Sequence, residues 1–159
     1  MFYKKTPIMI EKLQNSELEI AEKIRAVFQV SYKVEAKLLA AVHFPPLQRP
    51  LEKYRESSTE FYGYTKDGEL AGIVEIDANN TYILIRSLVI HPIFFRQGIA
   101  GKLIEFVFDT FDSNLFVVET GLANGPATKL YQKFGFIEVH QWDTDHGIRK
   151  VKFEKKIKN

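Results

Sequence analysis

The feature that most constrains the fold is a long apolar strand that leads through a proline and a glycine-rich turn into an apolar helix. Residues 81–90, TYILIRSLVI, are apolar on both faces of an expected strand apart from Arg86 and Ser87. A strand of this kind is central in its sheet and covered on both sides. Pro92 and the turn at 95–102 follow it, and the apolar residues of 99–111 recur at helical spacing. We therefore expect a central strand and a helix packed onto the sheet.

The rest of the chain supplies the other elements of a sandwich of helices and one sheet. Ser16 and Glu19 form a capping-box pattern, which predicts an amphipathic helix behind it. Further helices are expected over 32–41, 50–56 and 126–134, and strands over 7–13, 60–65, 70–77, 115–119, 136–142 and 148–153. The order β-α-α-β-β-β-α-β-α-β-β predicts an α/β (α+β) fold, with a mixed, largely antiparallel central sheet flanked by helices on both faces.

The totals are those of an ordinary globular chain. Its 159 residues suit a single domain over 1–159, and 45% apolar with 26% charged residues is an average composition. The net charge of +2 is too small to indicate a nucleic-acid or membrane partner, and no apolar run reaches the length of a membrane helix. The chain has no cysteine, which suits a cytoplasmic location. His43, His140 and His146 lack metal-ligand spacing, so no metal is expected.

The glycine-rich turn is compatible with one of three phosphate-binding patterns. A Walker A loop needs glycine at Arg96 and Ser or Thr at Leu103, and a dinucleotide fingerprint also needs glycine at Leu103. The remaining pattern is a helix N-terminus, where unpaired N–H groups and the dipole bind phosphate. Small residues at Gly98, Ala100 and Gly101 would let a pyrophosphate approach, and Arg96 could add a charged contact. A structural turn without a ligand is the alternative.

Two blocks of the sequence carry a resemblance to a known family. The first is Leu88-Val89-Ile90-His91-Pro92 followed by Gly98-Ile99-Ala100, and the second runs from Asn124 to Phe136 as NGPATKLYQKFGF. Together they resemble the GNAT superfamily of acyl-CoA-dependent N-acetyltransferases. One position departs from its signature, because Phe95 stands where the superfamily has Arg or Gln, and Arg96 follows one residue later.

The resemblance implies acetyl-CoA as the co-substrate and a primary amine as the acceptor, with direct attack in a ternary complex. It implies that the pantetheine arm and pyrophosphate contact these residues: Leu88, Val89, Ile90, Arg96, Gln97, Gly98, Ile99, Ala100, Gly101, Lys102 and Asn124. Asn124 could instead cap the helix that follows it. The last strands of this fold often pair between subunits, so a homodimer is a further expectation.

The resemblance also indicates catalytic roles. Tyr131 stands at the position of the acid that protonates the leaving thiolate, which a phenol can do because its pKa of about 10 is close to that of a thiol. Glu119 is the first choice for the base that deprotonates the amine, with Glu75 second and His91 third. Ordinary packing or hydrogen-bonding roles are the alternatives for all four side chains. A non-catalytic acyl-CoA-binding sensor of the same fold is the alternative function, and the acceptor itself is not defined by the sequence.

Overall fold

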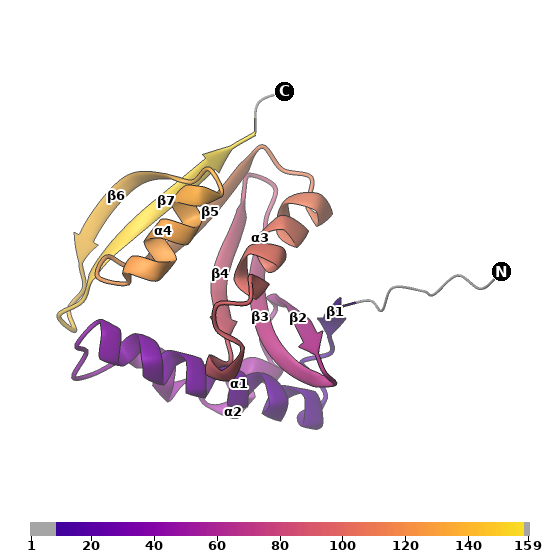
Figure 1. The fold of residues 1–159 in the computed structure, drawn as a ribbon. Helices are drawn as coiled ribbons and strands as arrows, with labels where there is room; N and C mark the ends of the chain where they lie inside the picture. The colour runs from indigo at the N-terminus through magenta and orange to yellow at the C-terminus, as the bar shows by residue number, and fades with distance from the viewer. Residues whose placement is uncertain (1–8, 158–159) are drawn as a thin grey trace.

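A computed structural model describes residues 9–157, and these form one seven-stranded sheet between two layers of helices (Figure 1). The strand order is β1-β2-β3-β4-β5-β7-β6, and every neighbouring pair is antiparallel except β4–β5. The strands are β1 (Ile10–Leu13), β2 (Glu60–Lys66), β3 (Glu69–Ala78), β4 (Ile83–Ile90), β5 (Leu115–Gly121), β6 (Ile137–Asp143) and β7 (Arg149–Lys156). This confirms the mixed, largely antiparallel sheet. Residues 7 and 8 of the expected first strand lie outside the described residues.

The helices divide between the two faces of the sheet. They are α1 (Leu18–Leu38), α2 (Leu51–Arg55), α3 (Ile99–Thr110) and α4 (Gly125–Lys133), with short 3-10 turns at Pro45–Gln48 and Pro92–Phe94. Helices α1 and α2 pack on one face through a buried cluster: Ile24, Val27, Phe28, Tyr54, Phe61, Ile73 and Val89. Helices α3 and α4 cover the other face, where Leu103, Ile104 and Tyr131 join a larger cluster. The expected flanking of the sheet on both faces is confirmed.

The first helical region differs from the sequence expectation in two ways. Helix α1 is continuous over Leu18–Leu38, whereas separate helices were expected before residue 29 and from residue 32. No glycine or proline interrupts residues 29–31, so nothing in the backbone ends the helix there. The capping-box prediction was also wrong. Glu17 is the N-cap and makes no side-chain cap bond, which places Ser16 one residue too early to cap the helix.

The sheet opens between its two central strands. Within the described residues, β4 and β5 pair only through Ile83–Ile85 and Phe116–Val118. Beyond this point β4 stays paired with β3 as far as Ile90, and β5 stays paired with β7 as far as Gly121. The two halves of the sheet therefore diverge and leave a wedge, which lies above α1 in Figure 1.

A β-bulge marks the start of the wedge. Glu75 pairs with Ser87 and Ile76 pairs with Ile85, which leaves Arg86 as the extra residue on β4. A bulge bends its strand and interrupts the alternation of side chains. As a result both Arg86 and Ser87 face the same side of the wedge, where they line one cavity. Within residues 9–157 no helix combines the length and the apolar character that crossing a membrane requires.

Candidate active site

Two cavities meet in the wedge between β4 and β5. The first, of about 300 Å³, we call the Tyr131 cavity; Tyr32, Ser87, Glu119, Tyr131 and Lys150 are among its lining residues. The second, of about 470 Å³, we call the glycine-turn cavity; it is lined by residues 98–101 and by parts of α1, β4 and α4. Glu35, Leu88 and Asn124 line both. The two cavities therefore adjoin at these three residues.

The glycine-rich turn forms one wall of the second cavity. Arg96 and Gly98 both adopt left-handed backbone conformations, with φ of 63° and 76°. Gly98 is the N-cap of α3, and its carbonyl accepts the first helical hydrogen bond, from the Lys102 N–H at 3.1 Å. The N–H groups of residues 99–101 precede that bond and so have no acceptor within the helix. The start of α3 thus presents donors and the positive end of the helix dipole to the cavity.

Gly101 lies at a tight contact between α3 and α4. A Cβ atom at this position would lie 3.0 Å from the ring of Phe134, at the end of α4. The first turn of α3 therefore lies close to the end of α4, and residues of both helices line the cavity. Phe95, at the position where the family signature has Arg or Gln, is partly exposed and lines the same cavity as Arg96.

The structure brings together most of the residues that were expected to bind the cofactor. The glycine-turn cavity is lined by Leu88, Ile90, Arg96, Gly98, Ile99, Ala100, Gly101 and Asn124. Three other side chains point elsewhere. Val89 is buried in the α1-side cluster, Gln97 accepts a hydrogen bond from Lys66, and the Lys102 ammonium lies 3.4 Å from the Tyr64 hydroxyl. None of these three residues is among those that line the cavity.

Tyr131 lies where β5, β7 and α4 enclose the first cavity. Its side chain is only 5% exposed, and its ring packs edge-on against Phe136. Burial raises the pKa of Tyr131 well above its ordinary value, and nearby Glu35 and Tyr32 raise this pKa further. The phenol therefore keeps its proton throughout the neutral range. Glu119, on the neighbouring β5, is exposed and lines the same cavity.

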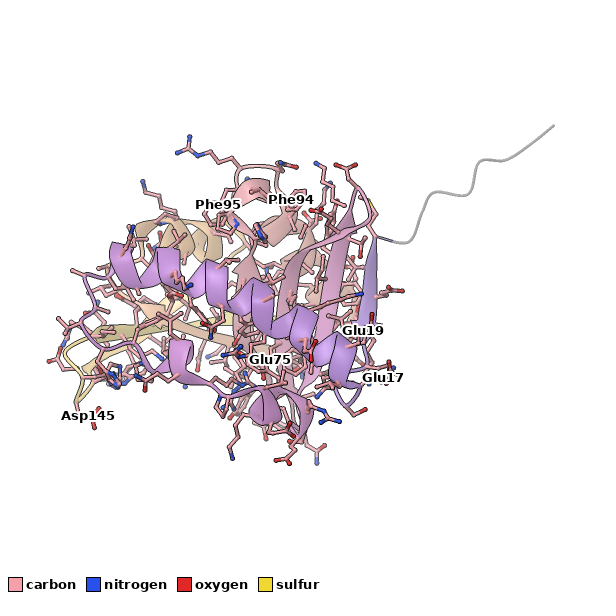
Figure 2. All side chains as sticks on the ribbon, turned by 90° about the horizontal axis from the view of Figure 1, so that it is seen from below. Glu17, Glu19, Glu75, Phe94, Phe95 and Asp145 are labelled. Carbon is pink, nitrogen blue, oxygen red and sulfur yellow. The ribbon has the colours of Figure 1, made fainter. Side chains whose placement is uncertain are left out.

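The second and third candidates for the base are engaged in other contacts. Glu75 is fully buried, and its carboxylate accepts two hydrogen bonds from Arg49, at 2.9 and 3.1 Å, one from Thr59 at 2.7 Å and one from Ser87 at 3.0 Å. Figure 2 shows it at the centre of the molecule. The ring of His91 accepts the Ile93 N–H through Nδ1, at 3.3 Å. Neither residue lines the two cavities of the wedge.

Asn124 joins α4 to α1. Its Oδ1 accepts the Ala127 N–H at 3.2 Å, so the helix-capping role is confirmed, and this bond fixes the start of α4. Its Nδ2 donates to Oε1 of Glu35 at 3.2 Å. The side chain therefore lies at the junction of the two cavities, with its amide group turned toward α1.

Glu35 is the residue that sequence reasoning missed. Burial raises its pKa, although the hydrogen bond from Asn124 and the nearby Lys150 ammonium partly offset this increase. One signal could have revealed it. Ile24 and Phe28 begin a stripe along α1, and positions 31 and 35 continue that stripe at helical spacing. A carboxylate on the core-facing stripe of a helix is unusual unless it has a partner or a function.

Within the described part of the chain, no three His, Asp or Glu side chains gather as the ligands of a metal ion would. The chemistry available in the wedge comes from two phenols, two carboxylates that differ in exposure, four basic side chains and the donors at the start of α3. The phenols are those of Tyr32 and Tyr131, and the basic side chains are those of Arg86, Arg96, His146 and Lys150.

Comparison with known proteins assigns the family. Residues 33–157 match the family model described as "Acetyltransferase (GNAT) domain". The chain belongs to this family of acetyltransferases, which confirms the resemblance carried by the two sequence blocks. A curated relative, UPF0157 protein YqkA of Bacillus subtilis (strain 168), is 38% identical over 141 residues. That alignment covers 88% of this chain but 41% of YqkA, so the chain spans less than half of its relative.

Solved structures share the fold at low identity. The ribosomal-protein-S18-alanine N-acetyltransferase of Escherichia coli superposes with a TM-score of 0.74 at 17% identity, covering 94% of both chains. The PaiA N-acetyltransferase of Thermoplasma acidophilum, solved in complex with coenzyme A, gives a TM-score of 0.69 at 19% identity, with 94% of this chain and 100% of that chain covered. A GNAT acetyltransferase of Elizabethkingia anophelis, solved with acetyl-CoA bound, gives 0.57 at 19% identity over 76% of this chain and 88% of its own.

Proposed function

We propose that the protein transfers an acetyl group from acetyl-CoA to a primary amine by direct attack in a ternary complex. The observation that carries the proposal is the meeting of two cavities in the wedge, one at a helix N-terminus and one beside a buried tyrosine. Direct transfer needs the thioester and the amine to touch while each is held separately. The junction at Glu35, Leu88 and Asn124 provides such a place.

The glycine-turn cavity is the proposed acetyl-CoA site. The pyrophosphate would accept hydrogen bonds from the N–H groups at the start of α3, and Arg96 would add a charged contact. The pantetheine arm would lie along β4, where Leu88 and Ile90 line the cavity and β5 has diverged. A backbone N–H of this unpaired edge would polarise the thioester carbonyl. Support comes from the shared fold of relatives whose structures hold coenzyme A or acetyl-CoA.

Tyr131 is the proposed acid. The leaving group is the CoA thiolate, which would lie where the glycine-turn cavity adjoins the Tyr131 cavity. From that adjoining cavity the phenol would donate a proton to the sulfur. Because burial raises the pKa of Tyr131, the group stays protonated and remains available as a donor at neutral pH. The phenolate is correspondingly disfavoured, so donation must be coupled to the return of a proton from the reacting nitrogen.

Glu119 is the proposed final acceptor of the amine proton, through water. It lines the Tyr131 cavity and is exposed, so it can exchange protons with the solvent. An alkylammonium ionises near pH 10.4, roughly as a lysine does, and at neutral pH it needs such a path to lose its proton. The N-acetyltransferases that share the fold support an amine rather than an alcohol as the acceptor.

A homodimer formed through β6 is the proposed assembly. This strand is one of the two edges of the sheet within residues 9–157, and Ile137 and Val139 on it are exposed apolar side chains. An exposed edge of this kind can pair with a second copy. Light scattering of the wild type and of an Ile137→Lys/Val139→Lys variant would test it, because the charges should convert a dimer to a monomer.

The test of the proposed activity begins with a melting curve. Acetyl-CoA at about 100 times its Kd should stabilise the fold by about 2.7 kcal/mol, a rise in Tm of roughly 5–10 °C for a domain of this size. An amine panel with detection of the released thiol then measures turnover. Tyr131→Phe should keep the rise in Tm but lower kcat about 100-fold, whereas Tyr82→Phe, which changes a tyrosine outside both cavities, serves as the control. Binding without any transfer would instead indicate a non-catalytic acyl-CoA sensor.

A further inference from the structure

The junction of the two cavities contains one ionisable group. Of the three described residues that line both cavities, Leu88 is apolar, Asn124 is an amide and Glu35 is a carboxylic acid. Glu35 belongs to α1, which crosses beneath the wedge (Figure 1). A charge at this point lies next to both proposed substrates, whereas a charge elsewhere in either cavity lies next to only one.

The Glu35 side chain is held in place rather than free to turn. Oε1 accepts the Asn124 amide at 3.2 Å, and Asn124 is itself fixed as the N-cap of α4. This chain of bonds ties the carboxylate to the start of the helix that carries Tyr131. A carboxylate has about four lone-pair sites, so one hydrogen bond leaves it able to accept others.

The other two carboxylates fit this position less well. Glu75 is fully buried and accepts four hydrogen bonds. Glu119 lines the Tyr131 cavity and a third cavity that Arg86 and Lys150 also line, but not the glycine-turn cavity. Only Glu35, among the described carboxylates, combines partial burial with contact to both spaces.

We propose that Glu35 binds the ammonium group of the acceptor at the junction and takes its proton as the nitrogen attacks the thioester. The inference rests on the proposed function, because it presumes that the thioester lies in the glycine-turn cavity. It limits acceptors to amines that arrive as cations. It also explains why a carboxylate occurs on the core-facing stripe of α1.

The surroundings of Glu35 strengthen it as a base. Burial raises its pKa, so the carboxylate holds a proton more readily than an ordinary glutamate does. Other charged or titratable groups face the same cavity: Tyr32 on α1, Arg86 on β4, Glu119 on β5, Tyr131 on α4, Lys150 on β7 and His146 in the turn before β7. Lys150 opposes the rise in the pKa of Glu35. An acceptor ammonium would oppose it in the same way.

The protons and bonds of the step balance. Glu35 takes one proton from the ammonium, the C–N bond forms, and the carbonyl oxygen becomes an oxyanion. As the C–S bond breaks, Tyr131 gives its proton to the sulfur, and the second proton that leaves the nitrogen restores the phenol. Glu35 then passes its proton to solvent, through the exposed Glu119 or directly. The net products are the amide, free CoA and one proton.

The first test measures charge selectivity without turnover. Benzylamine, which is cationic at pH 7, and benzyl alcohol, its neutral analogue, are titrated by NMR into the protein saturated with free CoA. The wild type should bind the ammonium about tenfold more tightly than the alcohol, because a hydrogen bond to a charged group contributes about 1.5 kcal/mol. Glu35→Gln should reduce the ratio to about one. Glu22→Gln, on the exposed face of the same helix, should retain it.

A wild type that shows no preference for the ammonium would overturn the proposal, as would a Glu35→Gln protein that keeps the preference. Melting curves with acetyl-CoA verify that each variant folds and binds the co-substrate. Glu35→Asp retains the charge and should keep part of the preference for the ammonium. This second variant keeps the test valid if Glu35→Gln disturbs the fold.

The second test uses turnover with any amine that the wild type accepts. Glu35→Gln should lower kcat/KM about 100-fold and remove the fall in rate that accompanies protonation of the base at low pH. If Glu35→Gln turns over with an unchanged pH profile, the role of Glu35 is refuted while the acetyltransferase activity stands. If the wild type binds acetyl-CoA and prefers the ammonium but acetylates no amine, the activity is refuted while the binding role of Glu35 stands.

Discussion

The buried ion pair between Arg49 and Glu75 should dominate the stability of the α1-side layer. Arg49 makes two hydrogen bonds to the carboxylate and places its guanidinium 4.2 Å above the ring of Tyr54. Glu75 has no exposed surface, whereas Arg49 keeps 20% of its side chain exposed. Removing Arg49 therefore leaves the Glu75 carboxylate charged and without access to water. Removing the carboxylate leaves the guanidinium, which still reaches the solvent.

Arg49→Met is the perturbation that exposes this asymmetry. Breaking a buried pair by removing one partner costs about 3–5 kcal/mol. The lower end applies here, because Thr59 and Ser87 still donate to the carboxylate. A loss of about 3 kcal/mol lowers the Tm of a domain of this size by roughly 6–12 °C. Glu75→Gln keeps an acceptor for these donors and should cost about half as much.

The double variant Arg49→Met/Glu75→Gln gives the decisive comparison. It removes the buried charge together with its partner, so it should be more stable than Arg49→Met alone, by about 1.5 kcal/mol. Urea unfolding curves of the wild type and the three variants measure these differences, with the contact to Tyr54 lost equally in both proteins that lack Arg49. If the double variant is less stable than Arg49→Met, the cost does not come from a stranded charge and the reasoning fails.

Three further predictions follow from single contacts. Tyr32 and Tyr54 both pack edge-on against Phe28, but Tyr32 donates to Ser87 whereas the buried Tyr54 hydroxyl has no partner within the described residues. Tyr32→Phe should lower the free energy of unfolding by about 1 kcal/mol and Tyr54→Phe should not lower it, as urea unfolding would show. Gly98→Ala should cost about 1 kcal/mol because of the left-handed backbone, and Gly98→Asn less; similar melting temperatures for the two would contradict this. Because burial raises the pKa of Glu35, ionising it costs more in the folded chain than in the unfolded one. Stability from this group is therefore full below the ordinary glutamate pKa of about 4.3 and is lost as the pH rises through the raised folded pKa. The Tm of Glu35→Gln relative to wild type should accordingly rise as the pH increases from that value.

Local patterns were enough to predict most of the fold. The run at 81–90 is apolar on both faces, and it became the central strand β4. The Asp67-Gly68 pair became the β2–β3 turn, with both residues in left-handed conformations. Gly135, also left-handed, ends α4 as its position after the apolar stripe predicted. These outcomes depend on residues close together in the chain, where propensity and turn chemistry act directly.

The site was predicted less completely, because its geometry depends on distant contacts. Nothing near Glu119 in the sequence indicates that Glu35, on the first helix, lies in the same cavity. The strand position of Glu75 made it a reasonable candidate base, but its carboxylate forms an ion pair with Arg49. Arg49 lies in the connection between two helical segments, far from Glu75 in the sequence. The wedge depends on a bulge at Arg86, which no local pattern marks.

The short seam between β4 and β5 makes the sheet behave as two hydrogen-bonded ribbons. One ribbon consists of β1, β2, β3 and β4, and the other consists of β5, β6 and β7; within each, neighbouring strands are hydrogen-bonded along most of their length. Residues 83–85 of β4 and 116–118 of β5 join the two ribbons. Local opening begins where such bonds are fewest. Amide hydrogens at the seam should therefore exchange sooner than those of β3 or β7. A molecule bound in the wedge would contact both ribbons and slow the exchange of amide hydrogens in β4 and β5 together. The two ribbons would then open as one cooperative unit, so amide exchange would report whether the wedge is occupied.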